Sequence, residues 1–226
     1  MNVFSQEKKI SVLDENKPKD SIVYKSNYGL RVGADISKPI LKTFDSDYTG
    51  FELVADYRIA QNYYIALEIG YEEETTKEDF TNSTASGNYF RLGFNYNAYE
   101  NWLDMNNEIY IGMRYGFSSF DQTLNSFTPN VTDPDNGIYF PADKITTPIE
   151  SEGLTAHWTE FVVGVKAETF KNLYVGFSFS YKIVLSIEDP ENFQTLYAPG
   201  FNRVYQSDTG FGFNYTISYL IPLFKK

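Results

Sequence analysis

The sequence predicts an all-β protein, an antiparallel up-and-down transmembrane β-barrel of eight strands. Apolar and polar residues alternate with period two over most of the chain, while windows with helical period are scarce. Aromatic residues make up 18% of the 226 residues, with 19 Tyr and 19 Phe. The connections between alternating segments are longer and shorter in turn, as in outer-membrane barrels. These three observations together favour a barrel in a membrane.

Eight alternating segments are each long enough to cross a bilayer as a tilted strand, which takes about 9–11 residues. They lie near residues 28–37, 51–59, 63–72, 89–96, 109–118, 160–167, 173–183 and 211–221. One face of each segment is apolar and rich in Tyr and Phe, whereas the other combines Gly, small polar residues and ions. The lumen of an eight-stranded barrel is only wide enough for side chains. We therefore expect the bulky face outside against lipid and the small face inside.

The inward faces carry six cations and six anions. An isolated buried charge costs several kcal/mol, so a dry lumen requires these ions to pair and to form hydrogen bonds. The predicted lumen ion network consists of Arg31, Asp35, Glu52, Asp56, Arg58, Glu68, Glu72, Arg91, Arg114, Glu160, Lys166 and Lys182.

Two other architectures stay open. A soluble two-sheet sandwich would place the ionic faces in water. A ten-stranded barrel would draw two further strands from residues 120–155, although this segment alternates poorly and contains four prolines.

The chain divides into a membrane domain and a short N-terminal region. We expect a residual signal peptide at residues 1–5, a periplasmic tail at 6–26 and the barrel at 27–224. Because long connections of such barrels are extracellular and both termini periplasmic, the predicted outer loops are 73–87, 120–155 and 187–207. Aromatic side chains are enriched at protein interfaces, so the predicted partner contacts in these loops are Phe127, Tyr139, Phe140, Phe193 and Tyr197. Packing over the barrel mouth is the alternative role for them.

Composition argues against most other functions. The net charge is −11 and no basic stripe is visible, so we expect no nucleic-acid partner. The chain lacks Cys and has one His, His157, which leaves neither a thiolate nucleophile nor a multi-histidine metal centre. Residues 133–137 resemble the start of a calcium loop, but Lys144 stands where such a loop needs a bidentate Glu. We expect no enzyme activity, metal or cofactor. An outer-leaflet lipid hydrolase using His157 is the remote alternative.

Two stretches, YGLRVGADISKP at residues 28–39 and NWLDMNNEIYIGMRYGFSSF at 101–120, resemble a family of small outer-membrane proteins of unknown function from Bacteroidota. The resemblance covers about residues 24–224. It implies an outer-membrane barrel that serves as an accessory subunit of the Bacteroidota barrel assembly machinery. Its partners would be outer-membrane lipids, the insertase barrel and a surface lipoprotein. It transfers no catalytic residues. A free-standing structural or adhesive barrel and a narrow channel are the alternative functions.

Overall fold

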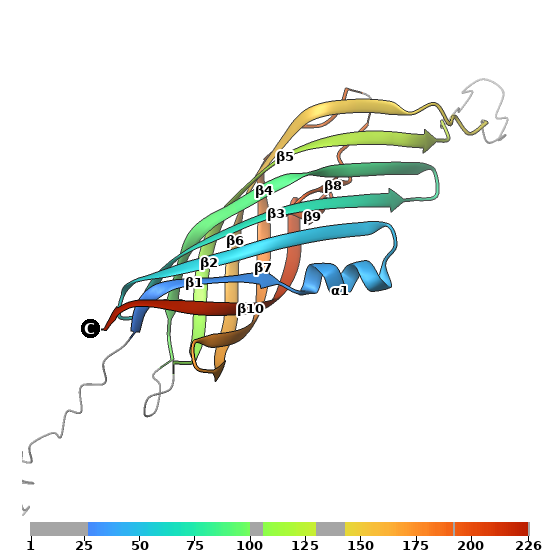
Figure 1. Ribbon diagram of the computed structural model, residues 1–226. Helices are drawn as coiled ribbons and strands as arrows, with labels where there is room; N and C mark the ends of the chain where they lie inside the picture. The colour runs from blue at the N-terminus through green and yellow to red at the C-terminus, as the bar shows by residue number, and fades with distance from the viewer. Residues whose placement is uncertain (1–26, 100–105, 130–142, 192, 226) are drawn as a thin grey trace, which may run out of the picture.

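The computed structural model describes residues 27–99, 106–129, 143–191 and 193–225. Eight long strands close into one ring in the order β1-β10-β7-β6-β5-β4-β3-β2, and every neighbouring pair is antiparallel (Figure 1). The strands are β1 (Asn27–Asp35), β2 (Tyr48–Ala60), β3 (Tyr63–Lys77), β4 (Thr81–Asn97), β5 (Glu108–Phe127), β6 (Ile149–Phe170), β7 (Leu173–Ile187) and β10 (Thr209–Lys225). The predicted all-β, antiparallel, eight-stranded fold is confirmed.

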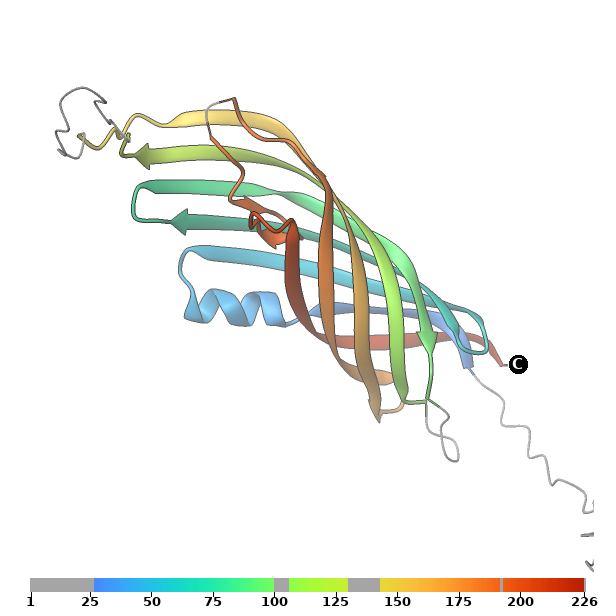
Figure 2. The same cartoon turned by 180° about the vertical axis from the view of Figure 1, so that it is seen from behind.

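Three short elements lie in the connections at the end of the ring opposite the C-terminus (Figure 2). Helix α1 (Ser37–Phe44) follows β1, and strands β8 (Tyr197–Ala198) and β9 (Asn202–Arg203) form a small hairpin between β7 and β10. Because β8 and β9 pair only with each other, they add no strand to the ring.

The two faces of the wall have the polarity that the alternation predicts. On β3, the side chains of Tyr63, Ile65, Leu67, Ile69 and Tyr71 are all exposed on the outer surface. The intervening positions of the barrel wall point into the lumen, where ionic and small polar side chains are buried. The exposed apolar surface continues on every long strand of the ring, so the barrel is apolar outside and polar inside.

The three predicted outer loops are shorter in the structure than the sequence analysis expected. Most of residues 73–87 is strand, because β3 runs to Lys77 and β4 begins at Thr81. Likewise β5 and β6 take residues from both ends of 120–155, and residues 195–204 of the 187–207 loop fold into the barrel mouth. Beyond the apolar belt the outer face of these strands is polar, while only scattered apolar side chains such as Phe120 and Leu154 remain on the inner face, so the period-two pattern weakens although the backbone stays extended.

Helix α1 was not predicted. Asp35 lies one residue before the N-cap, Ile36, and holds the first helical residue: its Oδ1 accepts the backbone N–H of Ser37 at 2.9 Å and its Oδ2 accepts the Ser37 hydroxyl at 2.8 Å. Pro39 lies in the first turn, where a missing N–H does no harm. The expected signal peptide (1–5) and tail (6–26) lie outside the described residues.

Large rings fit inside the barrel because glycines lie directly across the strand from them. Tyr89 pairs with Gly70, Tyr110 with Gly164, and Trp158 with Gly116. A Cβ on Gly116 would stand 2.1 Å from the Trp158 ring, and Trp158 is completely buried. These glycines therefore provide close approach for a ring, as in other sheets where an aromatic side chain covers a cross-strand glycine.

We predict that Gly116→Ala destabilises the barrel by about 1–3 kcal/mol, because the buried Trp158 ring cannot move away from the new methyl group. Urea unfolding in detergent, followed by the gel mobility of the folded barrel, measures the change. Ser119→Ala, on the outer face of the same strand, is the control and should unfold like the wild type. Equal midpoints for the two variants would contradict the packing described here.

Candidate functional site

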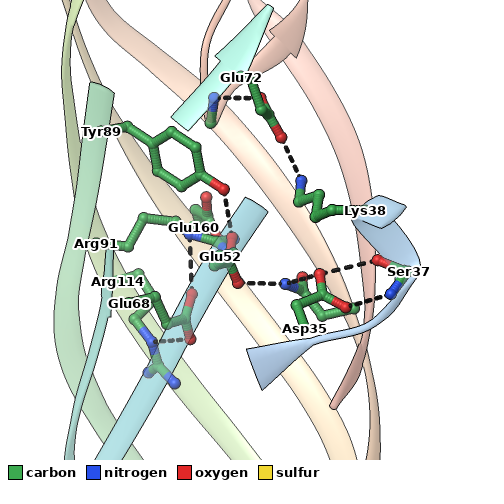
Figure 3. A network of polar contacts seen from close by, with 12 residues as sticks. Asp35, Ser37, Lys38, Glu52, Glu68, Glu72, Tyr89, Arg91, Arg114 and Glu160 are labelled. Carbon is green, nitrogen blue, oxygen red and sulfur yellow. Dashed lines mark hydrogen bonds and ion pairs between the residues drawn. The ribbon is translucent and has the colours of Figure 1, made fainter. Parts of the chain in front are cut away.

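A network of ions and hydrogen bonds fills the lumen (Figure 3). At its centre the guanidinium of Arg91 on β4 pairs with three carboxylates from three other strands: Glu52 on β2, Glu68 on β3 and Glu160 on β6. The Nε–Glu68 distance is 2.8 Å and the Nη1–Glu160 distance is 3.4 Å. One cation thus ties together four strands of the ring.

Polar side chains complete this central group. The hydroxyl of Tyr89 donates to Glu52 at 2.5 Å, and the indole N–H of Trp158 donates to Glu160 at 2.7 Å. The amide of Asn214 donates to both Glu52, at 2.6 Å, and Asp35, at 2.8 Å. These neutral donors complete the hydrogen bonding of carboxylates that the cations satisfy only in part.

A second group lies toward the short-turn end of the lumen. Arg31 donates to Asp56 and, across the lumen, to Glu108, with both Nη2–oxygen distances 2.8 Å. Lys166 pairs with the same Asp56. Between the two groups a cavity of about 30 Å³ is lined by Arg31, Asp56, Glu68, Asn95, Arg114 and Lys166 among other residues. A water molecule needs about 10–15 Å³ of such space, so the cavity holds only a few waters.

Residues 195–204, here called the mouth plug, close the other end of the lumen. Glu72 accepts the Tyr197 hydroxyl at 2.8 Å and the backbone N–H of Gly200 at 2.7 Å, and it also pairs with Lys38 of α1. Lys182 of β7 donates to the carbonyl of Gly200 at 2.6 Å. Two charged groups of the wall therefore hold the plug from opposite sides of one turn.

An apolar cluster supports the mouth plug from within. Its members come from three strands of the ring and from the plug, and they are Ala85, Tyr89, Phe120, Leu154, Ala156, Trp158, Tyr197, Ala198 and Phe201. Phe201 meets the Trp158 ring edge to face, with 6.0 Å between ring centroids. Burial, followed by the nearby Glu72, raises the pKa of Tyr197 well above its ordinary value, so this hydroxyl remains a neutral donor.

The structure brings eleven of the twelve predicted network residues into the lumen and places Arg58 elsewhere. Arg58 lies at the rim beside the short turn, where its Nε donates to the carbonyl of Gln61 at 2.9 Å and its guanidinium covers the rings of Tyr28 and Tyr64. The remaining members are buried or nearly so, and Asp35 is held by hydrogen bonds to Ser37, Asn214 and Tyr215.

The five aromatic residues predicted as partner contacts lie in different surroundings. Tyr197 is buried in the mouth plug, which is the packing role given above as the alternative to a partner contact. Phe127 is half-buried at the end of β5, where its backbone bridges to Ile145, and Phe193 is half-buried too. Tyr139 and Phe140 lie outside the described residues, as does the calcium-like stretch 133–137. His157 lies on the outer face, with Nδ1 2.7 Å from the Tyr115 hydroxyl.

A family model described as "Domain of unknown function (DUF6048)" matches residues 1–226. The chain belongs to the DUF6048 family. Neither the search of curated proteins nor the search of solved structures gave a match. The lumen network and the mouth plug are therefore the features from which the role of this DUF6048 protein has to be argued.

Lys38 and Glu108 are the network members of this DUF6048 chain that the sequence analysis missed. Lys38 belongs to the unpredicted helix α1, and Glu108 is the first residue of β5, one position before the alternation becomes visible. Charge balance did not reveal them, because the predicted ions already numbered six cations and six anions; in the structure Lys38 pairs with Glu72 and Glu108 pairs with Arg31.

Two negative findings concern the described part of the DUF6048 chain. Among these residues, no three His, Cys, Asp or Glu side chains come together as a metal site. None of the helices within the same ranges is long and apolar enough to cross a membrane.

We predict that Arg91→Leu destabilises the barrel by about 3–5 kcal/mol, because it leaves three buried carboxylates without their shared cation. Unfolding in detergent, followed by gel mobility, measures the loss. The matched control is Lys77→Leu, which removes an ion pair with Asp47 whose side chains are 56% and 36% exposed and which contributes little. If Arg91→Leu proved as stable as Lys77→Leu, the network would not be holding the ring together.

Proposed function

We propose that this DUF6048 protein is a non-enzymatic integral outer-membrane β-barrel with a filled lumen, whose extracellular end binds protein partners. The observation that carries the proposal is the polarity of the closed ring. Its outer surface exposes large apolar side chains on every long strand, while its charged side chains are buried and paired inside. Water outside such a wall would face an apolar surface far larger than soluble monomers expose, whereas lipid would match it.

The ends of the ring support one orientation. The start of β1, the end of β10 and the short β2–β3 and β6–β7 turns lie at one end, and the longer connections with α1 and the mouth plug lie at the other (Figure 1). In outer-membrane barrels the short turns are periplasmic and the long loops extracellular. We therefore place the mouth plug and the outer ends of β2 to β6 outside the cell.

A filled lumen argues for binding rather than transport. The lumen cavity of about 30 Å³ is far too small for a solute, and the plug covers it on the outside. At the same outer end several large apolar side chains are exposed beyond the belt, including Phe44 on α1, Phe80 in the β3–β4 turn and Tyr205 after the plug. Exposed apolar side chains of this kind mark interaction sites.

We propose that the partners belong to an outer-membrane protein assembly complex. This finer assignment rests on the resemblance of residues 28–39 and 101–120 to small Bacteroidota outer-membrane proteins. It would place the barrel beside the insertase barrel, with a surface lipoprotein bound at the extracellular end. The exposed Phe44, Phe80 and Tyr205 are the contacts that we assign to the lipoprotein.

The membrane assignment predicts that the chain fractionates with the outer membrane and that the unboiled protein migrates faster in gels than the boiled one. The filled lumen further predicts no discrete conductance steps in planar bilayers. Recovery in the aqueous fraction without heat-modifiable mobility would overturn the barrel-in-membrane proposal, and stepwise conductance would replace the binding role by a channel.

The partner assignment predicts that the tagged chain, purified in mild detergent from its native membrane, brings the insertase barrel and a lipoprotein with it in stoichiometric amounts. Phe80→Ser should reduce lipoprotein recovery severalfold without changing heat-modifiable mobility, because Phe80 is 65% exposed beyond the wall. Phe170→Ser, which replaces a ring that is 73% exposed at the opposite end, is the control. Recovery of the barrel alone would remove the assembly role.

A further inference from the structure

The barrel wall is incomplete on one side of its outer end. Strand β1 stops at Asp35, which pairs with Thr216, so the outer part of β10 has β7 on one side and no strand on the other. In Figures 1 and 2 this part of β10 turns away from α1 and rises beside β9. The first residues of β10 therefore form a free strand edge inside an otherwise closed ring.

Hydrogen bonds on either side identify which backbone groups face this edge. The Asp208 carbonyl accepts from Val184 of β7, whereas the Tyr215 carbonyl accepts from Ile36 on the β1 side. Backbone groups alternate along a strand, so those of Phe211 and Phe213 point away from β7. The Phe211 carbonyl receives a long contact, 3.4 Å, from the Asn202 amide. Within the described ranges, Phe213 N–H and C=O have no partner.

A cavity of about 450 Å³ lies against this edge. Helix α1, the outer ends of β2 and β3, the mouth plug and β10 all contribute to its lining, through Lys38, Asp45, Tyr48, Glu74, Arg203 and Phe213 among others. An exposed strand edge is a template for pairing with another chain, and a pocket beside it can receive a side chain of the added strand.

The charges around the cavity select the side chain that it would receive. Asp45, Asp47 and Glu74 all line it. The cations nearby already have partners, because Lys38 pairs with Glu72, Lys77 with Asp47 and Arg203 with Glu78. Among the residues that the structure describes, the side chain of Glu74 has no hydrogen bond or ion pair of its own. The charge of Arg203 acts on this half-buried carboxylate, but the Arg203 guanidinium pairs with Glu78, so Glu74 has no cation in direct contact.

The surroundings of Glu74 disfavour the ionised form of its carboxylate. Burial, together with Asp45, Asp47 and Glu72, raises the pKa of Glu74 to about 7. The outward neighbour on β3 is Glu73, a charged residue at the surface, so this part of the strand lies beyond the apolar belt. A basic group placed here would relieve the repulsion and restore the ordinary acidity of Glu74.

We propose that an extended segment of a protein partner adds as a strand to the β10 edge at Phe211–Phe213 and places a Lys or Arg side chain in the cavity against Glu74. Lipid fits less well, because the three cations of the lining already have carboxylate partners and an acyl chain would leave the edge N–H and C=O groups unsatisfied. The inference rests on the proposed function, whose extracellular partner it describes more closely.

The test measures binding of a fluorescein-labelled peptide to the full chain purified in detergent, in mildly alkaline buffer where Glu74 is largely ionised. The probe is a short peptide of alternating Thr and Val with one central Lys. The matched peptides carry Glu in place of Lys, or N-methyl groups on alternate backbone nitrogens. We expect the Lys peptide to bind about tenfold more tightly than the Glu peptide, and the methylated peptide to lose binding.

Variants of the chain separate the edge from the pocket. Glu74→Gln should weaken the Lys peptide about tenfold, while Glu73→Gln, one residue away on the outer face, should not. Phe213→Pro removes the free N–H and leaves pairing with β7 in place, so binding should be lost; Phe213→Ala retains the N–H and should still bind. Heat-modifiable mobility confirms that each variant is folded.

Three outcomes would overturn the inference: equal binding of the Lys and Glu peptides, equal effects of the two Glu variants, or binding that survives Phe213→Pro. Uptake of a fluorescent phosphatidylethanolamine that the Lys peptide does not displace would instead assign the cavity to lipid. In each case the chain would still fractionate with the outer membrane. Failure of the proposed function would appear there, in the fractionation and mobility experiments, and not in peptide binding.

Discussion

Pairing of buried charge is the constraint on which the rest of this barrel depends. A lumen shut to bulk water must hold Arg31, Arg91, Arg114, Lys166 and Lys182 without full solvation, and this is tolerable only when carboxylates and neutral acceptors such as backbone carbonyls surround each cation. Arg91 meets that demand with partners from three other strands. The network consequently fixes how the strands face one another across the lumen, which the backbone ladder alone does not do.

The same constraint explains the mouth. Glu72 sits at the outer limit of the lumen, and its acceptor sites are filled by α1, β2 and the plug, through Lys38, Tyr48, Tyr197 and Gly200. The plug thus completes the polar chemistry of the wall while its Phe201 closes the apolar cluster around Trp158. Plug and wall form one folded unit, and this leaves the outer ends of the strands and the seam beside β10 as the accessible features of that end.

The ring could be predicted because the alternation of apolar and polar residues shows which face of each strand is buried. The prediction of the strand ends failed where this alternation stops. Glu73 and Glu74, or Thr75 and Thr76, are polar on both faces, so the strand extensions resembled loops although they are paired. Alternation also assigns a side chain to a face but not to a depth, which is why Arg58 was grouped with the lumen ions although it lies at the rim. Lys38 lies in a helix that the periodicity did not predict. Tyr197 lies in a loop that folds back into the barrel mouth, with positive φ angles at Gly200 (79°) and Asn202 (82°), and the sequence pattern did not predict this long-range fold.

The strands of the ring are very unequal, from 9 residues in β1 to 22 in β6. The β1–β2 seam joins only Leu30–Asp35 to Glu52–Tyr57, whereas the β5–β6 seam runs from Glu108 to Leu124. A closed sheet with one short strand pair deforms there first, because fewer inter-strand hydrogen bonds resist the deformation. Strands β3 to β6 therefore form the stiff part of the barrel wall and β1 the compliant part, so lateral pressure from the surroundings changes the cross-section of the barrel at β1 first.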